Sequence, residues 1–391
     1  MTKARPKLAV VSSHVIQHFA PVYRYIAQSG LIDLRVFYLA ENGANTYRDA
    51  GFGVDFSWDV PLTDGYQYEF VEPGRVLDRF EFSSMDSKFI RSKVASFEPD
   101  YIWLHGYGMR ANWRVLLRKL GSAKIIYWSD SNLTDSRSAL RKFIKSKIVR
   151  FFLAKCDYFL SISNANTAYL QHYGVTPSQI VETTFPIDTQ RFAEAQRSIS
   201  KSDQAAQRKK LGVPPAANII LFAGKLVDYK RPADAIKALA EPHMEDLHLI
   251  IVGSGDLQQA LVTLVQNLAL TKRVHFCGFV NQSHLPLYFS IADLLVFPSE
   301  KEPYGAIAAE TLSFGLPIVA SDRIGALGSS IFAGQNGLVY PVGNVPAMAK
   351  AIRDVLKPEN CKAFGDFSRS IADAHDHSVM ARAIIRICSQ P

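Results

Sequence analysis

Short apolar runs alternate with longer, partly polar segments along most of the chain. Each run is bounded by glycine, proline or polar residues, which is typical of a buried β-strand. The segments between the runs are long enough for amphipathic helices. Strands are predicted over residues 8–11, 34–39, 101–104, 124–128, 158–162, 219–223, 247–252, 293–298 and 317–320. This alternation predicts an α/β protein with parallel sheets.

The pattern divides the chain into two α/β domains. One is predicted over residues 1–190 and the other over residues 216–366. Residues 191–215 are rich in Gln, Ser, Ala, Lys and Arg, which indicates a linker with a surface helix. A last helix is expected in residues 367–391, and residues 41–74 have no clear period. Residues 41–74 therefore predict either a long excursion from the first domain or an insertion.

Composition limits the classes of protein. The 391 residues are 48% hydrophobic, which is enough for two or three domain cores. The net charge of +8 suits an anionic partner such as a nucleotide, a phospholipid or a nucleic acid. The four cysteines are far apart without a CxxC pair, so neither a disulfide framework nor a zinc site is predicted. No run of about eighteen apolar residues occurs, and a cytoplasmic protein is expected.

The segment over residues 299–321 carries Glu302 and Glu310 where the strand at 293–298 gives way to a predicted helix. Parallel sheets bind ligands outside the carboxyl ends of their strands, where helix N-termini favour anions. Eight helical residues rise about 12 Å, so the two glutamates could bind opposite ends of one elongated ligand. A nucleotide-sugar has hydroxyls at both ends and a diphosphate between them. The alternative is that both are solvated surface charges.

A second cluster of charge follows the strand at residues 219–223. Lys225, Lys230 and Arg231 stand at this strand-to-loop junction and could neutralise a diphosphate without a metal. Taken alone, Lys225 is more simply interpreted as a surface lysine. The glycines Gly253 and Gly255 follow the next strand and are a weak signal, because any strand-to-helix turn uses glycine.

Seven elements occur in one order across residues 219–341. They are Gly224-Lys225-Leu226, Lys230, Gly253-Ser254-Gly255, residues 274–280 with Phe279, Ala292-Asp293, Pro298-Ser299, and the pair Glu302 and Glu310. In this order the chain resembles the retaining, family 4 glycosyltransferases of the GT-B fold. The resemblance implies two doubly wound, Rossmann-like domains facing a cleft. It also implies a UDP- or GDP-linked sugar donor, retention of configuration, a sugar, lipid-linked or small-molecule acceptor, and no metal or other cofactor.

The same resemblance implies roles for single residues. Lys225 and Lys230 would hold the donor diphosphate, Glu302 would contact the transferred sugar, and Glu310 would bind the ribose hydroxyls. The donor side would further include the backbone near Tyr304, Gly305 and Ala306, together with Gly253, Gly255 and Phe279. Two residues depart from the family's common pattern, namely Lys225, where Arg is frequent, and Thr311, where Ala is frequent.

The first domain contributes histidines and one carboxylate to the expected cleft. His14 and His18 lie in the loop after the first strand, and His105 follows the strand at residues 101–104. Packing or capping roles are the alternative for each histidine. Members of the family often carry a histidine after the strand at residues 124–128, where this chain has polar residues including Asp130. Asp130 is the candidate acceptor-side catalytic group, and a helix N-cap is the alternative.

A basic helix is predicted over residues 137–155. Leu140, Ile144, Ile148 and Phe151 fall on one arc, and seven basic residues lie elsewhere. Such a helix either lies on an anionic membrane or packs its apolar arc on the sheet.

Together these features predict a glycosyltransferase of cell-surface polysaccharide, lipopolysaccharide or glycolipid biosynthesis, with peripheral membrane attachment left open and no nucleic-acid partner. A sugar-nucleotide 2-epimerase or a phosphorylase on the same scaffold is one alternative, but it needs a base or cofactor lysine that the motifs do not indicate. A non-catalytic nucleotide-binding protein is the other.

Overall fold

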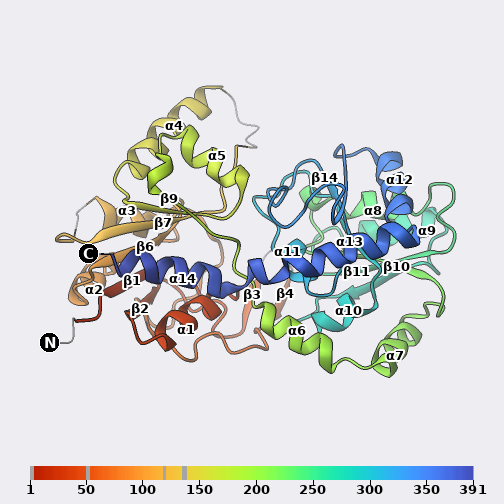
Figure 1. Ribbon diagram of the computed structural model, residues 1–391, viewed down its shortest axis with the longest axis horizontal. Helices are drawn as coiled ribbons and strands as arrows, with labels where there is room; N and C mark the ends of the chain where they lie inside the picture. Colours follow the sequence, from red (N-terminus) through yellow and green to blue (C-terminus); the bar gives the residue numbers. More distant parts are fainter. Residues whose placement is uncertain (1–3, 50–52, 118–119, 134–138, 391) are drawn as a thin grey trace. The chain divides into compact units, whose positions relative to one another are not determined.

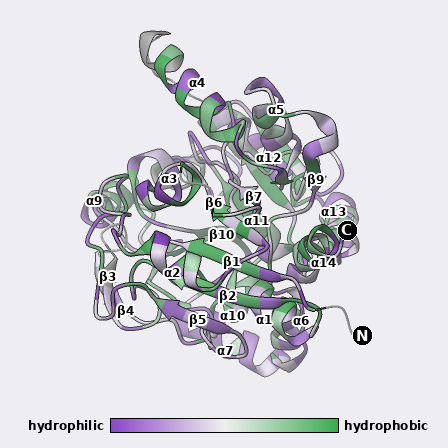
Figure 2. Ribbon diagram, turned by 90° about the vertical axis from the view of Figure 1, so that its left-hand side faces the viewer, coloured by the Kyte–Doolittle hydropathy of each residue, from purple (hydrophilic) through white to green (hydrophobic). Residues whose placement is uncertain are grey.

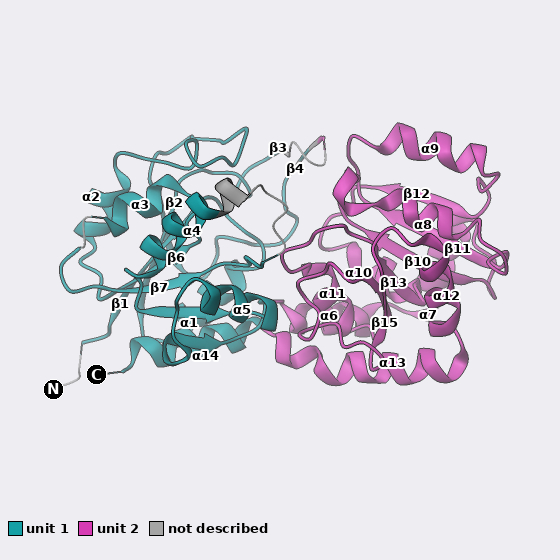
Figure 3. Cartoon of the chain, turned by 90° about the horizontal axis from the view of Figure 1, so that it is seen from above, with its two compact units in different colours: residues 1–48, 55–186, 377–391 teal, residues 49–54, 187–376 magenta. Residues whose placement is uncertain are grey.

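A computed structural model describes residues 4–49, 53–117, 120–133 and 139–390. The chain forms two compact units (Figure 3). Unit 1 comprises residues 1–48, 55–186 and 377–391, and unit 2 comprises residues 49–54 and 187–376. Each unit is built on one parallel sheet, so the α/β class and the doubly wound architecture are confirmed.

Unit 1 contains seven parallel strands among its described residues, in the order β5-β2-β1-β6-β7-β8-β9 (Figure 1). Their bounds are β1 (Lys7–Ser12), β2 (Asp33–Tyr38), β5 (Gln67–Phe70), β6 (Tyr101–His105), β7 (Lys124–Trp128), β8 (Tyr158–Ser161) and β9 (Ile180–Glu182). The short strands β3 (Tyr47–Asp49) and β4 (Val54–Phe56) form a separate two-stranded sheet. The apolar runs became central strands because such strands are buried on both faces.

The helices of unit 1 are mostly short, and they match the predicted segments between the strands. They are α1 (Ala20–Gln28), α2 (Ile90–Ser96), α3 (Arg110–Leu116), α4 (Ala139–Leu153), α5 (Asn164–His172) and α14 (His377–Cys388), with the 3₁₀ turn η1 (Pro177–Gln179). The core between these helices and the sheet is aromatic. Trp103, Tyr127, Phe152 and Phe159 are each fully buried.

The region over residues 41–74 is only partly an excursion. It contains β5, which pairs in parallel with β2 and ends the sheet. The pattern concealed this strand because an edge strand is exposed, and Tyr68 within it is 41% exposed.

Unit 2 contains six parallel strands among its described residues, in the order β12-β11-β10-β13-β14-β15. Their bounds are β10 (Asn218–Ala223), β11 (Leu247–Val252), β12 (Val274–Gly278), β13 (Leu294–Phe297), β14 (Ile318–Ser321) and β15 (Gly337–Tyr340). The helices are α6 (Thr189–Ser198), α7 (Lys201–Leu211), α8 (Pro232–Ala238), α9 (Gln258–Asn267), α10 (Leu285–Ile291), α11 (Ala306–Leu312), α12 (Val345–Val355) and α13 (Pro358–Ile371), with the 3₁₀ turns η2 (Asp228–Lys230) and η3 (Ala372–His375).

Residues 191–215 form most of α6, all of α7 and a short connection to β10, and both helices pack against α10 within unit 2. Phe192 of α6 is buried and contacts the rings of Phe289 and Phe314. This segment therefore belongs to the folded unit, because Phe192 and Val213 are core residues.

The prediction of one continuous helix over residues 367–388 is wrong, because the structure has two helices there with a break between them. Helix α13 ends at Ile371, and the chain is extended at Asp376 before α14 begins. The break is held from a distant part of the chain, because Ile187 N donates to His375 O at 2.9 Å and Thr189 Oγ1 donates to Asp376 Oδ2 at 2.8 Å. Helix α14 then packs on α1 in unit 1 (Figure 1).

Helix α4 does not pack through the arc that the sequence indicates. Ile144, Ile148 and Phe151 are about half exposed, whereas Val149 and Phe152 are buried. The side chain of Leu140 lies outside the described residues. Apolar residues therefore occur on two faces of α4, and Figure 2 shows hydrophobic and hydrophilic positions mixed along it. No helix within the described residues has both the length and the apolar content needed to cross a membrane.

Candidate functional site

The strand order creates one ligand-binding position at each sheet. In unit 1 the chain leaves β1 toward β2 on one side and returns to β6 on the other, and in unit 2 it does the same at β10, β11 and β13. Ligands of doubly wound sheets bind at such switch points, outside the carboxyl ends of the strands. The predicted site residues fall on these two positions, one in each unit.

In unit 2, Glu302 and Lys230 form an ion pair. Lys230 Nζ donates to Glu302 Oε2, and Ser299 Oγ also donates to this oxygen at 3.4 Å. The side chain of Lys230 is 17% exposed and that of Glu302 is 13% exposed. The Lys230 ammonium further lies 5.7 Å from the centre of the Phe297 ring. The structure thus brings together a predicted phosphate ligand and a predicted sugar ligand.

Gly305 fixes the backbone between Glu302 and helix α11. Its φ of +99° is in the left-handed region, and a Cβ atom here would lie 2.4 Å from the Phe297 ring. The loop is also anchored from β14, because Ser321 Oγ donates to Ser299 O at 2.6 Å and Gly325 N donates to Glu302 O at 3.0 Å. Only glycine fits this position, so the approach to α11 is set by the backbone.

Glu310 is a buried carboxylate within α11, and only 5% of it is exposed. Burial raises its pKa to about 7, and the nearby Arg191 guanidinium opposes this rise. Arg191 comes from α6 and donates to Gln282 O at 3.0 Å and to Gln282 Oε1 at 2.7 Å. The sequence pattern missed Arg191 and Gln282, because α6 lies in the segment assigned to the linker.

The glycines after β10 and β11 have a structural role. A Cβ atom on Gly253 would lie 1.9 Å from Gly224 O, and one on Gly255 would lie 2.6 Å from Leu226 O. Leu226 N donates to Ser254 O at 2.9 Å, so the two loops run in backbone contact. Lys225 lies half-buried within the first of these loops. Gly253 and Gly255 therefore shape the loop that carries Lys225. Their predicted contact with the donor does not follow from this packing and stays a prediction.

The remaining residues predicted to bind the donor differ in how deeply they are buried and in which element they belong to. The Tyr304 side chain is buried, with its hydroxyl 3.3 Å from both Ser329 Oγ and His375 Nδ1. Its side chain is thus part of the core of unit 2, and the predicted role of its backbone is unaffected. Ala306 is the first residue of α11, and Phe279 is half-buried directly after β12.

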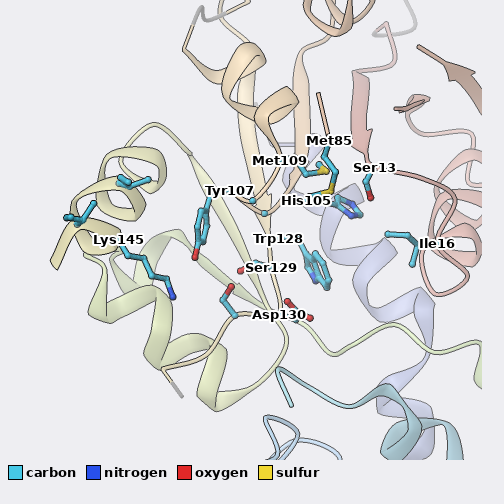
Figure 4. A pocket seen from close by; sticks show the side chains of 15 residues that line it. Ser13, Ile16, Met85, His105, Tyr107, Met109, Trp128, Ser129, Asp130 and Lys145 are labelled. Atoms are coloured by element: carbon cyan, nitrogen blue, oxygen red, sulfur yellow. The ribbon is translucent and has the colours of Figure 1, made fainter. Parts of the chain in front are cut away.

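Unit 1 holds a pocket of about 860 Å³ at the carboxyl ends of β1, β6 and β7 (Figure 4). Its lining residues come from the strand ends, from the segment near α3 and from α4. They include Ser13, Ile16, Met85, His105, Tyr107, Met109, Trp128, Ser129, Asp130, Ile144, Lys145 and Ile148. The structure therefore brings His105 and Asp130 to one pocket, as their positions at the carboxyl ends of neighbouring strands predict.

His105 is a buried, neutral imidazole. Its Nε2 lies 3.3 Å from Tyr23 OH, and burial lowers its pKa to about 3, with the charge of His14 acting in the same direction. Asn112 holds the backbone beneath it, because its Nδ2 donates to His105 O at 3.0 Å and to Gly106 O at 2.7 Å. The imidazole is therefore fixed in position and remains uncharged at neutral pH.

His14 and His18 are close in sequence to the lining residues Ser13 and Ile16, but they are not among the described residues that line the pocket. His14 Nδ1 is 2.8 Å from Ser13 Oγ, and the His14 ring centre is 4.4 Å from that of Phe80. The His18 ring contacts Phe185 at 5.1 Å. The sequence missed the apolar wall of the pocket, because that wall comes from α4 and from Met85, which lie far along the chain from β1.

Two doubly wound units with a binding position at each sheet define the GT-B fold. Similar solved structures include sucrose-phosphate synthase from Thermosynechococcus elongatus, at 19% identity and a TM-score of 0.73 over 98% of both chains. Anabaena HepE in complex with UDP and glucose has 17% identity and a TM-score of 0.72, over 98% of this chain and all of the other.

A family model matches most of unit 2. The model of glycosyl transferases group 1 covers residues 203–370, which is less than half of the chain. Those residues include the Lys230–Glu302 pair and Glu310.

Curated relatives match over part of the chain. D-inositol 3-phosphate glycosyltransferase 2 of Catenulispora acidiphila is 26% identical over 230 residues, which is 56% of this chain and 52% of the relative. N-acetyl-alpha-D-glucosaminyl L-malate synthase of Bacillus anthracis is 26% identical over 215 residues, which is 55% of this chain and 54% of the relative. The chain thus spans about half the length of these two relatives.

Glu310→Gln should stabilise the protein at alkaline pH. The folded-state pKa is about 7, above the ordinary value of 4.5, so the stability linked to the protonated carboxyl is present below pH 4.5 and lost as the pH rises through 7. Glutamine does not ionise, so the variant avoids this loss of folding stability, which is at most about 3 kcal/mol. Denaturant unfolding at pH 5 and pH 8 should show a gain that is larger at pH 8. Glu194→Gln, at an exposed site in α6, is the control. An equal gain at both pH values would contradict a buried, destabilised carboxylate.

Proposed function

We propose that the protein is a glycosyltransferase that takes its sugar from a nucleotide-sugar bound at unit 2. The observation that carries this proposal is the half-buried Lys230–Glu302 pair, which lies before α11 and its buried carboxylate Glu310 at the switch point of the sheet. The family match covers all three residues. The solved structures of HepE, similar in fold, hold UDP and UDP-glucose, which supports a nucleotide-sugar donor.

The proposed chemistry is electrostatic. Lys225 and Lys230 neutralise the donor diphosphate and stabilise the negative charge that grows on it as the bond to the sugar breaks. Because two lysines supply this charge, we propose that the reaction needs no metal. Lys230 already pairs with Glu302, so its ammonium is held in place before the donor binds. Glu302 then orients the sugar, and Glu310 accepts hydrogen bonds from the ribose hydroxyls.

Retention of the anomeric configuration is part of the proposal and is supported by the family resemblance. The acceptor is proposed to be a glycolipid or polysaccharide precursor. The names of the relatives identify inositol phosphate and malate as acceptors of those proteins, so the group accommodates chemically different acceptors. The acceptor pocket of this chain therefore has to be judged from its own residues.

The first test concerns the diphosphate. Lys230→Ala should lower turnover about 100-fold or more, as expected when one charge-stabilising donor is removed. EDTA should leave the unmodified protein active in an assay of sugar release or transfer from a panel of UDP- and GDP-sugars. Lys237→Ala, at an exposed position of α8, is the control. Activity that disappears in EDTA and returns with magnesium or manganese would refute metal independence.

The second test separates the two glutamates. Glu310→Gln should mainly weaken nucleoside diphosphate binding, because the ribose hydroxyls do not change during the reaction. Glu302→Gln should bind the nucleoside diphosphate nearly normally but transfer the sugar more slowly. The activation free energy should rise by about 1.5 to 3 kcal/mol, the contribution of one charged hydrogen bond. Calorimetry with UDP and GDP, beside initial rates at saturating donor, measures both effects. The opposite pattern would reverse the proposed orientation of the donor, and binding without any transfer or hydrolysis would favour a nucleotide-binding protein.

We also propose that α4 attaches the protein to an anionic membrane. Phe143 and Phe151 are 61% and 51% exposed, with the ammonium groups of Lys147 and Lys155 lying 5.4 and 4.9 Å from their ring centres. No acidic residue occurs in residues 137–156. Basic helices with exposed aromatic side chains bind at the interface of anionic bilayers.

The third test uses vesicles. The protein should co-sediment with phosphatidylglycerol vesicles more than with phosphatidylcholine vesicles, and salt should weaken this binding because charges are screened over about 8 Å at physiological ionic strength. Phe143→Ser and Lys147→Glu should each reduce co-sedimentation. Lys272→Glu, an exposed charge of unit 2, should not. Equal sedimentation with both lipids, or none with either, would refute the proposed attachment.

A further inference from the structure

The pocket of unit 1 has an unusual wall for a site that accepts a sugar. Its polar side chains come from the strand ends, namely Ser13, His105, Ser129 and Asp130, and Lys145 adds one cation from α4. Much of the rest is apolar: Ile16, Met85, Met109, Ile144 and Ile148, with the rings of Tyr107 and Trp128. A free sugar carries hydroxyls around its ring, and burying each without a partner is costly. The apolar wall therefore points to a ligand that is only partly polar.

Two buried polar atoms mark where the polar part would lie. His105 Nδ1 and Trp128 Nε1 have no hydrogen-bond partner among the described residues. His105 is 9% exposed, and its ring centre lies 5.3 Å from that of Trp128. Its other nitrogen, Nε2, lies 3.3 Å from Tyr23 OH, so Nδ1 is the ring nitrogen left without a partner in the described part of the chain. The indole N–H can only donate, whereas an imidazole nitrogen can accept or donate, and a hydroxyl can bond to both groups.

The apolar part would lie along α4. Ile144 and Ile148 line the pocket, yet 52% and 45% of their surfaces remain exposed. These residues are one helical turn apart on the same face, so they form a continuous apolar strip. The pocket volume of about 860 Å³ lies within the usual range for binding a sizeable organic molecule, roughly 300 to 1,000 Å³.

We propose that this pocket binds the acceptor and that the acceptor is amphipathic, with a hydroxylated head at His105 and Trp128 and an alkyl chain along Ile144 and Ile148. This inference rests on the proposed function for the identity of the ligand as an acceptor. In the reaction, the bond between the sugar C1 and the diphosphate oxygen breaks, and a bond forms between C1 and the acceptor oxygen. The hydroxyl proton leaves with the nucleoside diphosphate or enters solvent.

The experiment compares two ligands with the same head. The full chain is titrated with methyl β-glucoside and with octyl β-glucoside below its micelle concentration, by calorimetry and by tryptophan fluorescence. Octyl glucoside should bind at least tenfold more tightly, which corresponds to about 1.4 kcal/mol and to the burial of only about two methylene groups. Trp128→Phe should abolish most of the fluorescence change.

Variants on α4 locate the chain. Ile144→Asn and Ile148→Asn should each lower the affinity for octyl glucoside several-fold and leave that for methyl glucoside unchanged. Phe89→Asn is the control, because Phe89 is an exposed apolar residue of the same unit outside the described pocket lining. Equal binding of the two glucosides, no binding of either, or an equal loss in Phe89→Asn would each overturn the proposal.

Donor binding provides an independent readout. UDP or GDP should raise the melting temperature of Ile144→Asn and Ile148→Asn as much as that of the unmodified protein, since both residues lie in unit 1. A selective octyl glucoside effect without nucleotide stabilisation would support the amphipathic pocket and count against the donor proposal. Nucleotide stabilisation without that effect would support the donor proposal and overturn the amphipathic pocket.

Discussion

The ion pair between Lys230 and Glu302 is the interaction on which the unit 2 site depends. Removing two charges from water is costly, and a half-buried pair returns little net stability. The surrounding backbone nevertheless holds it in place. Arg231 follows Lys230 with a left-handed φ of +51° and donates to Asp234 Oδ2 at 2.7 Å, while Gly305 lies against the Phe297 ring on the other side. A site that stabilises a diphosphate needs charged groups whose positions are fixed before the ligand binds. This requirement explains why the backbone holds the Lys230–Glu302 pair in place although the pair adds little stability.

Much of the fold could be predicted because parallel strands are buried on both faces. Residues 219–222 and 249–251 form unbroken apolar runs, and such runs leave few alternatives to a central strand. The positions of Lys225, Glu302 and His105 followed from the same logic, since Lys225 and Glu302 lie in the loops after β10 and β13 and His105 is the last residue of β6. Edge strand β5 escaped detection because one of its faces meets solvent, so its residues do not form such a run.

The parts that could not be predicted depend on contacts between distant residues. The break between α13 and α14 is made by Thr189 and Ile187, which lie far away in the sequence, whereas the local pattern favours a continuous helix. The orientation of α4 was ambiguous for a related reason. Apolar residues occur on two of its faces, and only the packed structure determines that Val149 and Phe152 face the core. Arg191 likewise gained its significance only through its position near Glu310.

The two binding positions differ in how they treat charge. At unit 2, Lys230 and Glu302 keep a cation and an anion together, and Glu310 has a pKa of about 7, so a ligand that donates hydrogen bonds to it would favour its ionised form. At unit 1, His105 is held neutral by burial, and it shares its pocket with Trp128 and three isoleucines. In the proposed transfer, charge grows on the leaving diphosphate, whereas an acceptor hydroxyl begins neutral. Lysines around the donor and a largely apolar wall around the acceptor, with Asp130 and Lys145 as its charged residues, fit this division of charge.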